Sequence, residues 1–80
     1  MEWKTKITEL LGCQYPILRG AIAGLGKWEF AAAVARAGAH GTITGAVSRT
    51  PDRLREDIRR CRETAAGSTG TFGVNLYWYV

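Results

Sequence analysis

The sequence has few of the residues from which metal centres and disulfide frameworks are built. It contains two cysteines, Cys13 and Cys61, and a single histidine, His40. The cysteines lie far apart in the chain and form no Cys-x-x-Cys unit, so they predict neither a zinc site nor a redox pair. We expect both thiols to stay reduced, which is the state that the cytoplasm maintains.

Long apolar runs are also missing. No segment approaches the about 20 residues that span a bilayer, and the first residues contain no apolar core of a signal peptide. We therefore expect a cytoplasmic chain without a membrane partner. The composition, with 46% hydrophobic and 22% charged residues, excludes a disordered or fibrous protein.

A concentrated basic surface is absent too, although the formal net charge is +4. Between residues 49 and 63 the arginines alternate with acidic residues. This alternation is typical of a solvated helix face with pairs such as Glu56 and Arg60, four residues apart. No basic stripe interleaves with aromatic residues, so we expect no nucleic-acid partner.

The 80 residues allow one small domain, and turn signals divide it into short elements. Residues 5–11 predict a helical turn that Gly12 ends. Residues 16–18 (Pro-Ile-Leu) predict a buried strand with proline at the permitted first position. A small-residue loop follows, and residues 28–37 predict a helix with Phe30, Val34 and Ala37 on one face.

The second half continues this alternation. Residues 41–45 predict a second strand, and Thr50-Pro51-Asp52 is a strong helix start, with threonine as N-cap and proline in the first helical position. The helix carries Leu54, Ile58, Cys61 and Ala65 on one face. Residues 68–70 form a turn, and residues 72–80 predict a third strand.

The resulting order is βαβαβ, which predicts an α/β fold with parallel strands. Two helices cannot cover both faces of a three-stranded sheet, and parallel sheets require both faces to be covered or closure into a barrel. The last strand would also leave an uncovered apolar edge. We therefore expect this unit, residues 1–80, to be one part of a larger domain, with possible self-association through the open edge.

Three stretches in register resemble the beginning of the nitronate monooxygenases, also called 2-nitropropane dioxygenases. The stretches are ITELLG with YPILRG (7–12 and 15–20), FAAAVARAGAHGTI (30–43), and TPDRLR (50–55) continued to FGVNL (72–76). Flavin-type enoyl-acyl-carrier-protein reductases share the pattern. Each stretch alone is a weak signal, but the three in this order and spacing are specific and cover nearly the whole chain.

This resemblance implies the first three strands of a (β/α)₈ TIM barrel, truncated, with FMN at the carboxyl ends of the strands. It further implies oxidation of alkyl nitronates with O₂. By the same resemblance, Ala21, Ile22 and Ala23 after the first strand, and Asn75 in the third, contact FMN. The family's catalytic histidine and glycine-rich phosphate site would lie beyond residue 80, so no catalytic residue is expected within the chain.

Each of these residues also has a plainer interpretation. The loop 20–23 could be a tight turn that needs only small residues, and Asn75 could be a buried amide satisfied by neighbouring backbone. Tyr77 lies two residues on, on the same face of the strand, and is a weaker candidate for a cofactor contact. The family usually has Gln where Arg19 stands, and Gly-Met or Pro-Met where Ala21 and Ile22 stand, which bears on the substrate.

Three other features are not expected to carry chemistry. Residues 24–27 (Gly-Leu-Gly-Lys) lack the spacing of a phosphate loop, since Ala21 stands where the first glycine belongs and Trp28 where Ser or Thr belongs. His40 precedes the second strand, at the end of a barrel away from the chemistry, and should be structural. Cys61 should be a packing residue.

Three functions remain open from the sequence. The first is a portion of an FMN-dependent nitronate monooxygenase that is inactive by itself. The second is a non-catalytic βαβαβ module that folds by association with another chain. The third keeps FMN but reduces an enoyl thioester with NAD(P)H. In the first and third, the partners are FMN and a small-molecule substrate.

Overall fold

The computed structural model of the chain describes residues 4–20, 27–45 and 49–76. Its elements are α1 (Lys6–Leu11), α2 (Trp28–Arg36), β1 (His40–Thr44), α4 (Pro51–Ala65) and β2 (Thr71–Asn75). β1 and β2 form a parallel two-stranded sheet, and α4 connects them. The predicted α/β class with parallel strands is therefore confirmed.

The helices α1, α2 and α4 begin where the sequence predicts. In α1, the Thr5 and Thr8 side chains each accept a hydrogen bond from the other residue's backbone N–H, which is a reciprocal cap. Gly12 ends α1 with φ 69°, in the left-handed region that glycine tolerates. Thr50 caps α4 by accepting a hydrogen bond from the Arg53 N–H at 3.2 Å.

The strand predicted at residues 16–18 is present only as an isolated parallel bridge between Leu18 and His40. The His40 N–H donates to the Ile17 carbonyl, and the Arg19 N–H donates to the His40 carbonyl. The Arg19 side chain also contacts β1, since its guanidinium donates to the Thr42 carbonyl at 2.9 Å.

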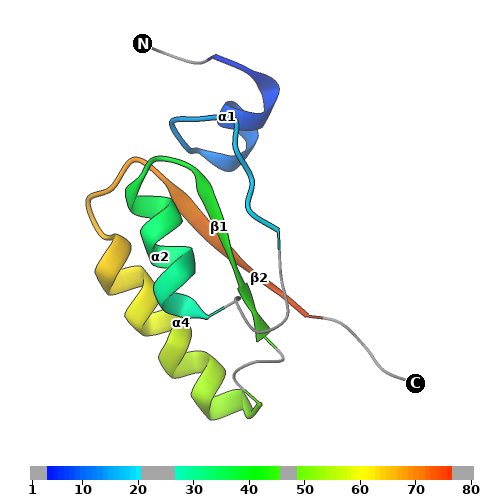
Figure 1. Cartoon of the computed structure of the whole chain (residues 1–80), viewed down its shortest axis with the longest axis vertical. Helices are drawn as coiled ribbons and strands as arrows, with labels where there is room; N and C mark the ends of the chain where they lie inside the picture. The colour runs from blue at the N-terminus through cyan, green and yellow to red at the C-terminus, as the bar shows by residue number, and fades with distance from the viewer. Residues whose placement is uncertain (1–3, 21–26, 46–48, 77–80) are drawn as a thin grey trace.

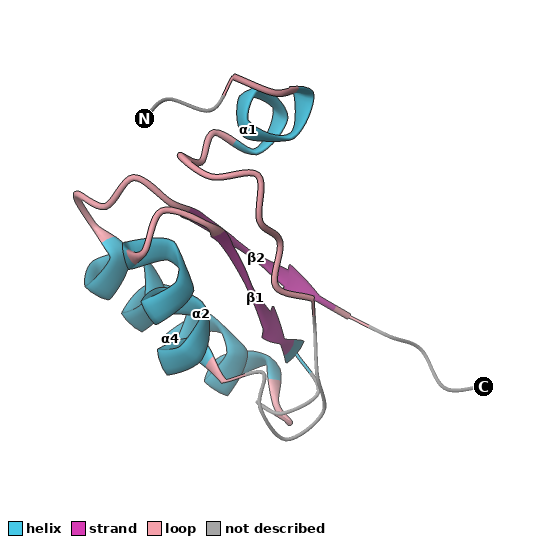
Figure 2. Cartoon of the chain, turned by 45° about the horizontal axis from the view of Figure 1, so that its top comes forward, coloured by secondary structure: helices cyan, strands magenta, loops and turns pink. Residues whose placement is uncertain are grey.

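The helices α2 and α4 lie side by side on one face of the sheet (Figure 1). The second view shows the same layer of helices beside the two strands (Figure 2). Between the layers lies a core of small and medium side chains, which are Ala31, Ala32, Ile43 and Cys61. The partly buried hydrophobic residues that pack against this core are Trp28, Leu54, Ile58, Phe72 and Val74. The face predicted for α4 is confirmed, with Cys61 fully buried.

The face predicted for α2 is wrong. Phe30 is 46% exposed and Ala37 is exposed, whereas Ala31, Ala32 and Ala35 are fully buried. The reason is the closeness of the helix to the sheet. A Cβ on Gly41 would stand 2.5 Å from the Ala31 carbonyl oxygen, so only small side chains fit between α2 and β1. The close approach of the two backbones therefore decides which face of α2 is buried, and the larger apolar residues of the helix stay outside the core.

Candidate functional site

The carboxyl ends of β1 and β2 are the first candidate site, because ligands of parallel α/β proteins bind at these ends. Thr44 and Asn75 are register partners and are the last residues of the two strands. Thr44 is buried, at 2% exposure. Gly45 follows, and a Cβ there would stand 2.5 Å from the Leu76 side chain. The strand ends are therefore closely packed on the β1 side.

Asn75 was expected to lie buried within an apolar strand, and this expectation is wrong. The side chain is exposed. The physical reason is that, among the residues that the structure describes, β2 pairs only with β1, so one edge of β2 is open. An exposed amide is solvated and incurs no desolvation penalty. Its position at the carboxyl end of the strand, however, agrees with the sequence analysis.

The other expected cofactor contacts, Ala21, Ile22, Ala23 and Tyr77, lie outside the described residues. Arg19, directly before that loop, is described and is held by two contacts. Its guanidinium donates to the Thr42 carbonyl and lies 4.2 Å from the centre of the Phe30 ring. A cation over an aromatic face is attracted by the ring quadrupole. Arg19 therefore ties the end of the Leu18 bridge to both α2 and β1.

His40 lies at the opposite end of the sheet from Asn75, as expected. It is the first residue of β1, and its Nδ1 is 2.8 Å from the Thr71 Oγ1 at the start of β2. A Cβ on Gly73 would lie 3.3 Å from the His40 Nε2, so glycine leaves room for the ring. His40 therefore joins the starts of the two strands, which is a structural role.

Neither cysteine has the surroundings of a nucleophile. Burial raises the pKa of the Cys61 thiol to about 11, so the neutral thiol predominates at neutral pH. The Cys13 Sγ is buried and donates to the Tyr15 carbonyl at 3.2 Å. In the described part of the chain, no three His, Cys, Asp or Glu side chains gather as a metal site would require.

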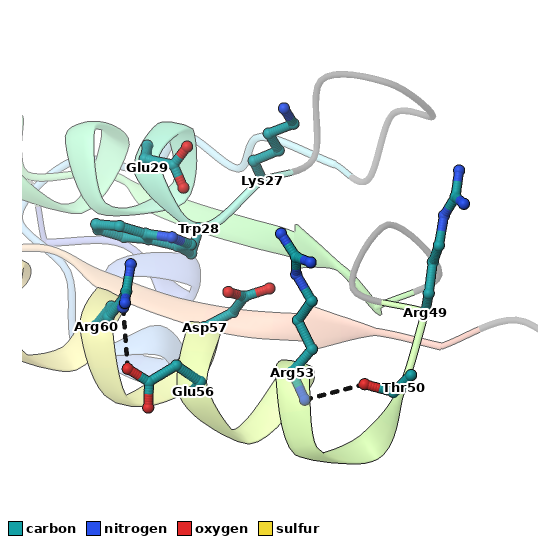
Figure 3. A pocket seen from close by; sticks show the side chains of 9 residues that line it. All are labelled: Lys27, Trp28, Glu29, Arg49, Thr50, Arg53, Glu56, Asp57 and Arg60. Atoms are coloured by element: carbon teal, nitrogen blue, oxygen red, sulfur yellow. Dashed lines mark hydrogen bonds and ion pairs between the residues drawn. The ribbon is translucent and has the colours of Figure 1, made fainter.

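A second candidate site is a groove between the beginnings of α2 and α4, here called the helix-start groove (Figure 3). Its lining is mostly charged and consists of Lys27, Trp28, Glu29, Arg49, Thr50, Arg53, Glu56, Asp57 and Arg60. Neither β1 nor β2 contributes a residue. Arg49, next to the N-cap, has φ 70°, which is rare for a residue other than glycine.

Sequence reasoning missed the helix-start groove, although the signals were present. Both helices were predicted to follow a strand, so their beginnings belong at the same end of a parallel sheet. Lys27 directly precedes α2, and Arg49 lies just before the Thr50 cap of α4. The expected pair of Arg60 with Glu56 is confirmed, with the Arg60 Nε 3.0 Å from the Glu56 Oε1. Hydrogen bonds from Arg59 and Arg60 lower the pKa of Glu56.

Comparison with known proteins identifies the family. The model of the nitronate monooxygenase family matches residues 4–79. The chain belongs to the nitronate monooxygenase family. It is 40% identical over 77 residues to a probable nitronate monooxygenase of Staphylococcus saprophyticus, which covers 96% of this chain and 21% of that protein. It is 32% identical over 74 residues to one of Staphylococcus aureus strain JH9, covering 92% of this chain and 20% of that protein.

The resemblance expected from the sequence is thus confirmed. The chain spans about a fifth of the length of the curated relatives it matches. Within the described residues, no helix is both long enough and apolar enough to span a bilayer.

Proposed function

We propose that this chain forms one wall of an FMN-binding (β/α)₈ barrel, whose complete form oxidises alkyl nitronates with O₂. The observation that carries the proposal is the place of Asn75, at the carboxyl end of a parallel strand in a chain of this family. Cofactors and substrates of such barrels bind at that end. Two buried free cysteines further support a reducing compartment such as the cytoplasm.

The residues at the strand ends fit a flavin. The Asn75 amide is exposed, so it is accessible to a ligand, and it offers both donors and an acceptor to a flavin or its ribityl chain. FMN, when bound, supplies the electron transfer between nitronate and O₂. The contribution of this chain would be to bind and orient the cofactor: Asn75 would hold it from β2, and Ala21, Ile22, Ala23 and Tyr77 would supply further contacts.

The test is a titration of FMN into the Asn75→Ala variant of the longest protein that the gene encodes. Flavin fluorescence monitors the binding. Loss of one hydrogen bond to the cofactor should weaken FMN binding roughly tenfold. Gln14→Ala is the matched control, because Gln14 is an exposed amide that contacts Thr69 near the start of β2, away from Asn75. Equal FMN affinity in wild type and Asn75→Ala would remove Asn75 from the cofactor site.

The substrate is tested separately on the same FMN-loaded protein. We expect turnover of an alkyl nitronate with consumption of O₂. Reduction of an enoyl thioester by NAD(P)H, with no nitronate turnover, would instead place the chain with the flavin-type enoyl reductases. The assignment of the cofactor site and the assignment of the substrate can therefore each be disproved without the other.

A further inference from the structure

The cationic side chains of the helix-start groove differ from the other arginines of α4 in their pairing. Arg59 and Arg60 form ion pairs with Glu56, and Arg55 pairs with Asp52. By contrast, over the described residues, no carboxylate forms an ion pair with Lys27, Arg49 or Arg53. These three residues are here called the cationic triad.

The cationic triad comes from two separate parts of the chain. Lys27 is the N-cap of α2, whereas Arg49 and Arg53 flank the first turn of α4. Figure 3 shows the three side chains extending in about the same direction from the two helix beginnings, with Glu29 on the far side of Lys27 from Arg49. Like charges that line one groove repel one another, so a bound anion would relieve the repulsion.

We propose that the helix-start groove binds a small phosphate-bearing molecule through Lys27, Arg49 and Arg53. Guanidinium groups match the tetrahedral oxyanion with paired donors, and the lysine ammonium adds a compact charge. Trp28, which also lines the groove, offers an apolar face beside the phosphate. The site is separate from the strand ends, since no residue of β1 or β2 lines it, and it does not depend on the proposed FMN contacts.

Asp57 and Glu29 also line the groove and set the selectivity of the site. Their negative charges oppose a large, highly charged polyanion, so the proposed ligand carries one phosphate or diphosphate group. Nucleic acid would meet these carboxylates along its backbone. The proposal is therefore for a small ligand, and the alternation of charge along α4 supports this choice.

The test is isothermal titration of inorganic phosphate and pyrophosphate into the longest form of the chain that the gene encodes, at constant ionic strength. We expect saturable binding of pyrophosphate that weakens as salt is raised. Arg53→Gln and Lys27→Gln should each weaken that binding roughly tenfold, as expected for loss of a charged hydrogen-bond donor. Titration of FMN in the same variants should be unchanged.

Arg62→Gln is the matched control, because it removes the same charge from an exposed position in the last turn of α4. Circular dichroism of each variant checks that the fold is retained. The second readout is the change in the NMR chemical shifts of the Trp28 and Thr50 amides when phosphate is added, which can be followed in any variant. Equal weakening by Arg62→Gln would show a general effect of net charge and overturn the site. Absence of saturable binding in the wild type would overturn it as well.

Discussion

At the scale of single residues, Gly41 shows how closely α2 packs on the sheet. A Cβ at this position would lie 2.5 Å from the Ala31 carbonyl oxygen and 2.9 Å from the Ala31 Cα. Both atoms belong to the backbone of α2, so the clash cannot be relieved by rotating a side chain. Gly41 therefore fixes the distance between α2 and β1.

Gly41→Ala should destabilise the fold by about 1–3 kcal/mol, the usual range for overpacking a dense core. The measurement is the free energy of unfolding from urea titration. Gly20→Ala is the control, since a Cβ on Gly20 would meet nothing within 4 Å. Similar stability of the two variants would show that α2 can move away from the sheet at little cost.

Cys61 gives a prediction about pH. Burial raises the pKa of its thiol to about 11, above the usual value for cysteine. A raised pKa means that the folded state favours the neutral thiol, so the corresponding stability is lost as pH rises from about 9 toward 11. Cys61→Ala should therefore show a shallower loss of unfolding free energy across this pH range. Parallel curves for the two proteins would contradict the assignment.

At the scale of elements, α4 depends on its N-cap. Thr50→Ala removes the acceptor for the Arg53 N–H and should lower the free energy of unfolding by about 1 kcal/mol. Thr50→Ser should restore most of it, because the hydroxyl remains. Thr64→Ala is an exposed change in the last turn of the same helix and should be close to neutral. Chemical denaturation of the three variants provides the comparison.

Helix starts could be predicted from the sequence because they depend on local chemistry. Thr50 with Pro51, and Gly12 after α1, act within one turn of the chain. The buried face of α2 could not be predicted, because it depends on the contact of Ala31 with Gly41 across two elements. The exposure of Asn75 likewise depends on which strands lie beside β2, and no local pattern reports that.

Prediction of the helix-start groove requires both local sequence signals and the packing of one element on another. The helix beginnings were predicted, but Lys27 and Arg53 line one groove only because α2 and α4 lie side by side. At the strand ends, Asn75 could be predicted as a cofactor contact from the resemblance to the family. Arg19 could be recognised only as a residue that differs from the usual Gln of the family. Its contacts with Thr42 and Phe30 come from the three-dimensional structure.

At the scale of the whole molecule, the described sheet has one helical layer, and its edge along β2 is open. Several large apolar side chains are exposed, among them Leu76 at 72% and Leu10 at 81%. Open edges of this kind pair with other chains. We therefore predict that the 80-residue chain self-associates as its concentration rises.

Leu76→Lys places a charge directly after β2 and should shift the sedimentation profile toward monomer at equal concentration. Leu10→Lys is the matched control, since it adds the same charge to a still more exposed leucine on α1. A similar shift in both variants would mean that charge alone, rather than the β2 edge, controls association. Addition of a further segment of the family's barrel should compete with this association.

The contact between Arg19 and the Thr42 carbonyl has a consequence for chimeric proteins. The Arg19 side chain also lies against the Phe30 ring, so its two contacts are with β1 and α2. A graft that exchanges residues 20–26 with a relative should therefore leave Arg19 in the host, because its partners Thr42 and Phe30 remain there.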